Sequence, residues 1–178
     1  MQAQNEAFAL LQDLERRSLI HAVGLPEQED LQQAWTGVGF RLHGVPLVAA
    51  IEEIAEIMPP PAMARVPMAQ PWLKGLANVR GTLIPVVDLH HYLFGEPMEE
   101  SKFSRVVVAR HETGDVGILV EGMLGQRHFT AEDETDTPQV PEPLQALVEG
   151  ALRQEDAVWA RIHFYRLFEQ ERFMQAAA

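Results

Sequence analysis

The chain has 178 residues with 47% hydrophobic composition, enough to bury a sizeable core as one large domain or two small intertwined ones. Its 14 basic and 26 acidic residues leave a formal charge of -12, and a field of that sign repels phosphate backbones, so nucleic acid is not an expected partner. The absence of cysteine excludes disulfides, thiolate metal sites and cysteine nucleophiles, and it suits a reducing compartment.

The first part of the chain has a helical pattern. Apolar side chains recur at helical spacing over residues 5–23, namely Phe8, Leu11, Leu14 and Ala22. Gly24 and Pro26 follow where a helix would stop, and a polar stretch comes after them. We therefore expect residues 1–34 to form an N-terminal helix and connector, and residues 35–178 to form the main domain.

The sequence predicts neither a leader nor a spanning helix. Residues 1–6 lack the basic region that opens a signal peptide. The longest apolar stretches, such as 83–87 and 106–109, are strand-sized and far below the roughly 20 residues that a spanning helix needs. A cytoplasmic location is expected.

From residue 35 onward the pattern becomes that of strands. Val38, Phe40 and Leu42 alternate with smaller or polar residues, and His43-Gly44 supplies a turn, so a β-hairpin is predicted. Further short apolar segments lie at 54–58, 82–87, 105–109, 116–120, 127–129 and 158–162. Many short strands with too little helical sequence between them predict a mainly β fold of small barrels or sandwiches.

Two helical segments interrupt the predicted strands. A short one follows Asp88, whose carboxylate could accept bonds from the first backbone N–H groups. A final helix is expected over about 163–174, and the acidic stretch 132–142 is typical of a solvated loop.

The sequence offers no catalytic or metal-binding motif. Its seven histidines follow no zinc-binding spacing, and His90 and His91 point about 100° apart on a helix, so they cannot readily share one ion. Its serines lie in no nucleophile elbow, and the glycine-flanked segment 75–81 lacks the Lys-Ser/Thr ending of a phosphate loop. The acidic neighbours Glu52-Glu53 and Glu99-Glu100 indicate ordinary surface charge. We expect a binding module with no cofactor and no metal.

The most informative segment is 65–95, RVPMAQPWLKGLANVRGTLIPVVDLHHYLFG. Its residues 78–81 predict a tight turn in which Gly81 takes positive φ and Arg80 lies at the apex. The apolar strand that follows contains Pro85, which predicts an edge or bulge position rather than a central one.

This segment resembles the defining motif of CheW-like coupling domains. In that family a Pro-x-Trp/Phe-hydrophobic-x-Gly-hydrophobic-x-Asn-hydrophobic-Arg-Gly run precedes a Val-Pro-Val-hydrophobic-Asp-Leu strand. Weaker likenesses at 54–57 (IAEI) and 116–121 (VGILVE) keep the family's order, so the resemblance covers residues 35 to about 168. Residues 8–41 are similar to the CheW-type adaptors of the type IV pilus, twitching-motility signalling system.

The resemblance implies two intertwined five-stranded SH3-like β-barrel subdomains with short peripheral helices and no catalytic residues. It also implies two partners: the regulatory domain of a CheA-type histidine kinase and the cytoplasmic tip of a methyl-accepting chemoreceptor, in membrane-associated arrays. The matching positions implied for partner binding are Ile54, Glu56, Asn78, Val79, Arg80 and Gly81. Those implied for the structural motif are Trp72, Gly75, Pro85 and Asp88.

Alternatives stay open at this stage. Arg80 could simply brace its own turn by pairing with Glu56, and Ile54 could be plain core. The adaptor could belong to a flagellar chemotaxis array, or the domain could act as part of a larger kinase polypeptide. From another class, the chain could be a small β-barrel enzyme or ligand-binding protein with a dispersed site, which a deep closed pocket with convergent polar groups would favour.

Overall fold

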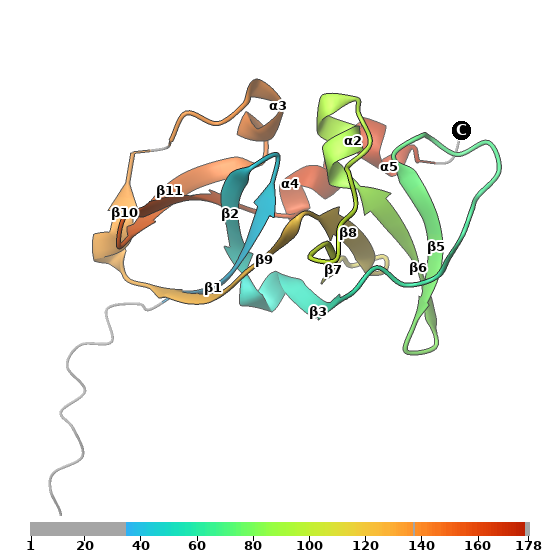
Figure 1. The fold of residues 1–178 in the computed structure, drawn as a ribbon, viewed down its shortest axis with the longest axis horizontal. Helices are drawn as coiled ribbons and strands as arrows, with labels where there is room; N and C mark the ends of the chain where they lie inside the picture. Colours follow the sequence, from blue (N-terminus) through green and yellow to red (C-terminus); the bar gives the residue numbers. More distant parts are fainter. Residues whose placement is uncertain (1–34, 137, 177–178) are drawn as a thin grey trace, which may run out of the picture. The chain divides into compact units, whose positions relative to one another are not determined.

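The computed structural model describes residues 35–136 and 138–176, which fold into two β-sheets with short peripheral helices (Figure 1). The first sheet contains β1 (Trp35–Leu42), β2 (Val45–Ala50), β9 (Gly122–Phe129), β10 (Glu134–Thr135), β11 (Val148–Gln154) and β12 (Ala157–Ile162). The second contains β3 (Ile54–Met58), β4 (Met63–Ala64), β5 (Leu73–Val79), β6 (Thr82–Asp88), β7 (Arg105–Ala109) and β8 (Val116–Val120). The α-helices are α2 (Leu89–Phe94), α3 (Glu142–Gln145), α4 (Tyr165–Phe168) and α5 (Glu171–Met174), and the 3₁₀ turns are η1 (Ile51–Glu53) and η2 (Ala131–Asp133).

The two sheets are intertwined along the chain. The first sheet has the order β10-β11-β12-β2-β1-β9, and the second, β3-β7-β8-β6-β5-β4, is built from the segment between β2 and β9. Each sheet has five strands of at least five residues and one two-residue strand. The mainly β fold is therefore confirmed, and the short strands β4 and β10 add a sixth member to each predicted set of five.

Local sequence explains the β1–β2 hairpin. The apolar residues Val38, Phe40 and Leu42 of β1 are all buried. His43 and Gly44 form the turn with φ of 51° and 72°, the positive values that a two-residue hairpin loop favours. The predicted hairpin is confirmed.

One core unites the two sheets. Phe40 and Leu47 of the first sheet belong to the same buried cluster as Val107 and Ile118 of the second. Phe164, which follows β12, stacks on Phe40 with ring centroids 6.0 Å apart. Because each fully buried side chain of this size stabilises a fold by roughly 1.5–3 kcal/mol, this shared core fixes the junction between the sheets.

Strand β6 corrects one prediction. It lies inside its sheet, between β8 and β5, and not at an edge. Pro85 stands opposite Leu76 of β5, and the parallel ladder with β8 starts one residue later, at Val86. The missing N–H of Pro85 therefore falls before that ladder begins.

The helical predictions have mixed outcomes. Helix α2 follows Asp88 as expected, and the Asp88 carboxylate accepts a bond from the backbone N–H of His91 at 2.9 Å. The single helix expected over 163–174 is instead the two four-residue helices α4 and α5. The N-terminal helix and connector expected over 1–34 lie outside the described residues. Within the part of the chain that the structure describes, no helix is long and apolar enough to cross a membrane.

Candidate functional site

The turn between β5 and β6 presents Arg80 at the tip of a hairpin. Val79 pairs with Thr82, and the two residues between them have positive φ, 50° at Arg80 and 90° at Gly81. The side-chain oxygen of Asn78 accepts a hydrogen bond from the Gly81 N–H at 2.9 Å. This local bond holds the turn, and it leaves the Arg80 side chain 80% exposed.

Arg80 reaches across the sheet to Glu56. Its Nε lies 2.8 Å from Oε2 of Glu56, and its Nη2 donates to Oε1 at 3.0 Å. Three strands separate β3 from β5 in the sheet order, so the curvature of the sheet brings the hairpin tip back to β3. The pair lies near solvent, where such contacts stabilise a fold by about 0–1 kcal/mol.

Strand β3 divides its side chains between the core and the surface. Ile54 belongs to the main core at 7% exposure, the alternative that the sequence left open, and it also lines the apolar groove described below. Ile57, three residues further along the strand, is 39% exposed and lines the same groove. The pairing of β3 with β7 shifts register between Ile54 and Glu56, and a bulge of this kind changes which side chains face outward.

An apolar groove lies beside the Arg80–Glu56 pair, at the junction of the two sheets. The cavity has a volume of about 350 Å³. Strands β1, β3 and β9 and turn η1 line it with Val38, Ile51, Ile54, Ala55, Glu56, Ile57, Met123, Gly125 and Gln126. Glu56 also lines a second cavity of about 220 Å³ together with Val79 and Arg80. One side chain thus borders both the apolar groove and the charged hairpin tip.

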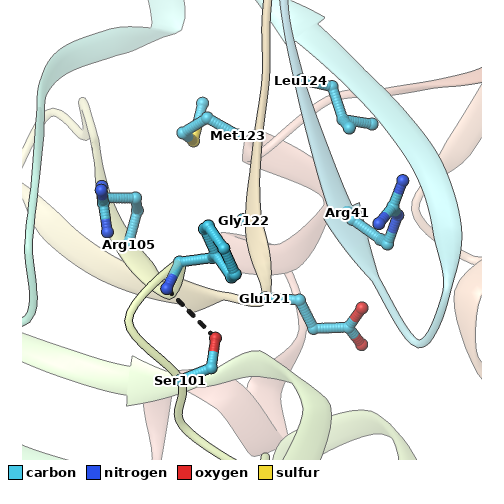
Figure 2. Close-up of a pocket in the computed structure, with 8 residues that line it drawn as sticks. Arg41, Ser101, Arg105, Glu121, Gly122, Met123 and Leu124 are labelled. Atoms are coloured by element: carbon cyan, nitrogen blue, oxygen red, sulfur yellow. Dashed lines mark hydrogen bonds between the residues drawn. The ribbon is translucent and has the colours of Figure 1, made fainter.

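A third cavity, of about 440 Å³, continues the same junction (Figure 2). Arg41 and Glu121 lie on one side of it and Arg105 on the other, with Met123 between them. Met123 lines this cavity and the apolar groove alike. Phe103, at 64% exposure, adds an apolar rim, so the junction combines exposed apolar surface with charges of both signs.

Three residues of the predicted structural motif are buried. Trp72 is 3% exposed and stacks on Phe173, with ring centroids 5.3 Å apart. Gly75 has φ of 150°, and a Cβ there would collide with the backbone carbonyl of Ala64. Asp88 is fully buried, and its second carboxylate oxygen accepts a bond from the Met98 N–H at 2.9 Å. These residues organise the backbone and offer little surface of their own.

Glu53 is not the ordinary surface charge that the sequence suggested. Its side chain is 15% exposed, and Oε2 accepts a bond from the backbone N–H of Phe164 at 2.7 Å. His163 Nδ1 lies 2.8 Å from the same oxygen. Burial raises the pKa of Glu53, while the Phe164 N–H and His163 oppose that rise. The carboxylate ties η1 to the start of the C-terminal helices.

Comparison with known proteins identifies the family. The sequence profile of the CheW-like domain matches residues 36–172. The chain belongs to the CheW-like domain family. The fold expected from the sequence resemblance is thereby confirmed, and the junction described above is a feature of a CheW-like domain.

Individual relatives support the same family assignment. The chain is 33% identical over 171 residues to Protein PilI of Pseudomonas aeruginosa, an alignment that covers 96% of each chain. It is 25% identical over 133 residues to the chemotaxis protein CheW of Thermotoga maritima, covering 75% of this chain and 87% of that one. The crystal structure of the scaffolding protein TtCheW from Thermoanaerobacter tengcongensis aligns with a TM-score of 0.66 and 25% identity, covering 77% of this chain and 94% of that one.

Proposed function

We propose that this protein is a non-catalytic adaptor that couples a methyl-accepting chemoreceptor-type protein to a CheA-type histidine kinase in the type IV pilus, twitching-motility system. The family assignment supports the scaffold role. The likeness to Protein PilI over nearly the whole chain favours the pilus system, because it extends through the N-terminal segment that the family profile does not match. The adaptor works in the cytoplasm, recruited to membrane-associated receptor arrays.

The observation that carries the proposal is the position of Glu56. It borders the apolar groove on one side, and on the other it pairs with Arg80 at the hairpin tip. A helical receptor tip offers apolar side chains along one stripe and charged side chains beside it, which is the chemistry that binds a helix in a groove. Ile57 and Met123 supply apolar contact, and the Glu56–Arg80 pair supplies charge complementarity.

The remaining predicted positions support this surface. Asn78 and Gly81 shape the turn, Val79 lines a cavity together with Arg80, and Ile54 lines the groove from the core side. A surface this small gives weak contacts between dilute partners, so the proposal also requires an array in which many copies raise the effective concentration.

Pull-down assays against one receptor tip and one kinase regulatory domain test the proposal. Ile57→Asp places a charge in the groove, and we expect it to abolish receptor-tip binding while kinase binding persists. Met174→Asp is the matched control, because Met174 is also exposed, at 55%, but does not line the groove. Binding of neither partner by the wild-type chain would overturn the proposal.

The system served by the adaptor is tested in cells. In a host lacking its own pilus-type adaptor, the wild-type chain should restore twitching but should not restore swimming in a strain lacking the flagellar CheW. The reverse result would assign the chain to a flagellar chemotaxis array. In either strain, Ile57→Asp should fail to restore movement.

A further inference from the structure

Two histidines meet at the junction of the sheets, on a surface separate from the groove. His43 lies in the β1–β2 turn and His90 in helix α2, 47 residues further along the chain. Their ring nitrogens, Nδ1 of His43 and Nε2 of His90, are 2.9 Å apart. Sequence spacing rejected a metal site at His90 and His91, but the fold gives His90 a different partner.

The hydrogen bonds of His90 fix its tautomer. Its Nδ1 lies 2.8 Å from the backbone carbonyl oxygen of Glu96, and a carbonyl can only accept, so Nδ1 carries the proton. With the proton on Nδ1, the metal-binding form of the ring directs the lone pair of Nε2 toward His43. Histidines that bind metals are oriented in this way, with the other ring N–H donated to a carbonyl or carboxylate.

The partner ring is also held in place. His43 stacks on Phe94 with ring centroids 4.0 Å apart, and the adjacent Gly44 N–H donates to the carboxylate of Glu121 at 3.2 Å. His43 takes a positive φ of 51°, a conformation that non-glycine residues adopt infrequently. The backbone of the turn and the stacking on Phe94 therefore hold Nδ1 of His43 facing His90.

The separation of the nitrogens suits a cation. Two nitrogens at about 2.0–2.1 Å from one ion lie about 2.9 Å apart when they bind at a right angle, and about 3.3 Å apart in a tetrahedral site. The first value equals the observed 2.9 Å, and the second needs a shift of a few tenths of an ångström at a partly exposed pair of rings.

We propose that His43 and His90 form a two-imidazole site for a divalent transition-metal cation of the Zn²⁺, Ni²⁺ and Cu²⁺ class. The cation takes the place of the hydrogen bond between the two rings. The proton on Nδ1 of His43 moves to Nε2 of the same ring, so both histidines bind as neutral imidazoles. No three His, Cys, Asp or Glu side chains cluster within the described residues, so water completes the coordination. Because one ligand comes from the β1–β2 turn and the other from helix α2, which follows β6 of the second sheet, the bound cation cross-links these two segments.

Titration calorimetry of the full chain with NiCl₂ and with ZnCl₂ tests this site. We expect one cation per chain and a higher thermal midpoint in its presence. His43→Asn and His90→Asn should each weaken binding at least about tenfold, because even outer-shell partners are worth about 10–100-fold. Asparagine is chosen because it tolerates positive φ, which keeps the turn intact.

His91→Asn, His111→Asn and His21→Asn are matched controls that should bind as the wild type does. Circular dichroism checks that each variant keeps its fold. The proposal is overturned if the wild type shows no saturable binding, if His43→Asn and His90→Asn bind unchanged, or if a control variant alone loses the cation. It does not depend on the adaptor function, since binding is measured without receptor or kinase.

Discussion

Replacing Arg80 with alanine separates a binding role for this side chain from a bracing role. The side chain is 80% exposed, and its contacts with Glu56 lie near solvent. Exposed pairs of this kind contribute about 0–1 kcal/mol, so the free energy of unfolding of Arg80→Ala should fall by no more than about 1 kcal/mol. If Arg80 contacts the receptor as a hot spot, the binding free energy falls by about 2 kcal/mol or more, which is roughly 30-fold in affinity.

The assay combines urea unfolding with receptor-tip affinity for Arg80→Ala, Glu56→Gln and the double variant. Arg153→Ala is the control, because Arg153 is an exposed arginine on β11 of the other sheet. The proposed interface is supported if the coupling energy between Arg80→Ala and Glu56→Gln is large for receptor-tip binding and small for unfolding. If the affinity of Arg80→Ala matches that of Arg153→Ala while stability drops, Arg80 only braces its turn and the reasoning is refuted.

Three further predictions concern the structure behind the surface. Asp88→Ala removes a helix cap, worth about 1 kcal/mol, and leaves the buried Met98 N–H without a hydrogen-bond acceptor, which costs about 1–3 kcal/mol. Urea unfolding should therefore show a free energy of unfolding lower by about 2–4 kcal/mol, and Asp88→Asn should lose less. Gly75→Ala should lower the free energy of unfolding by about 1–3 kcal/mol more than Gly114→Ala does. Both glycines have positive φ, but only at Gly75 would a Cβ collide with neighbouring backbone, so equal losses would refute the clash. Burial raises the pKa of Glu53 above 4.5, so its contribution to stability is complete below pH 4.5 and is lost as pH rises through the raised value. The free energy of unfolding of Glu53→Gln, taken relative to that of the wild type, should therefore be higher at about pH 7 than at about pH 4. A difference that does not change with pH would contradict this.

The strands that sequence predicts best are those with strong local signals. The β1–β2 hairpin combines apolar alternation with a turn of two residues suited to positive φ, and β3, β7 and β8 are short apolar runs. Strand β11 was missed because its sequence, VEGALRQ, has no such run. Its extended state comes from pairing with β10 and β12, which is tertiary structure that a local pattern does not contain.

In the candidate site, too, features set by local sequence were predicted and features set by tertiary contacts were not. Turn chemistry predicted the exposed Arg80 at the hairpin tip, since Asn78 and Gly81 favour that turn locally. Alternation places Ile54 and Ile57 on opposite faces of β3, but it does not say which face packs into the core, and the core contacts of Ile54 come from distant segments of the chain. The contact between His43 and His90 joins the β1–β2 turn to helix α2, 47 residues further along the chain, and no spacing in the sequence encodes it.

The most direct test of the adaptor role is kinase control by a receptor. Receptor-containing vesicles, a CheA-type kinase and this protein are combined, and kinase autophosphorylation is measured with and without receptor stimulus. The stimulus should change the rate only when the protein is present, and Ile57→Asp should abolish that response while leaving kinase binding intact. A response of equal size without the protein, or none with it, would contradict the proposed coupling.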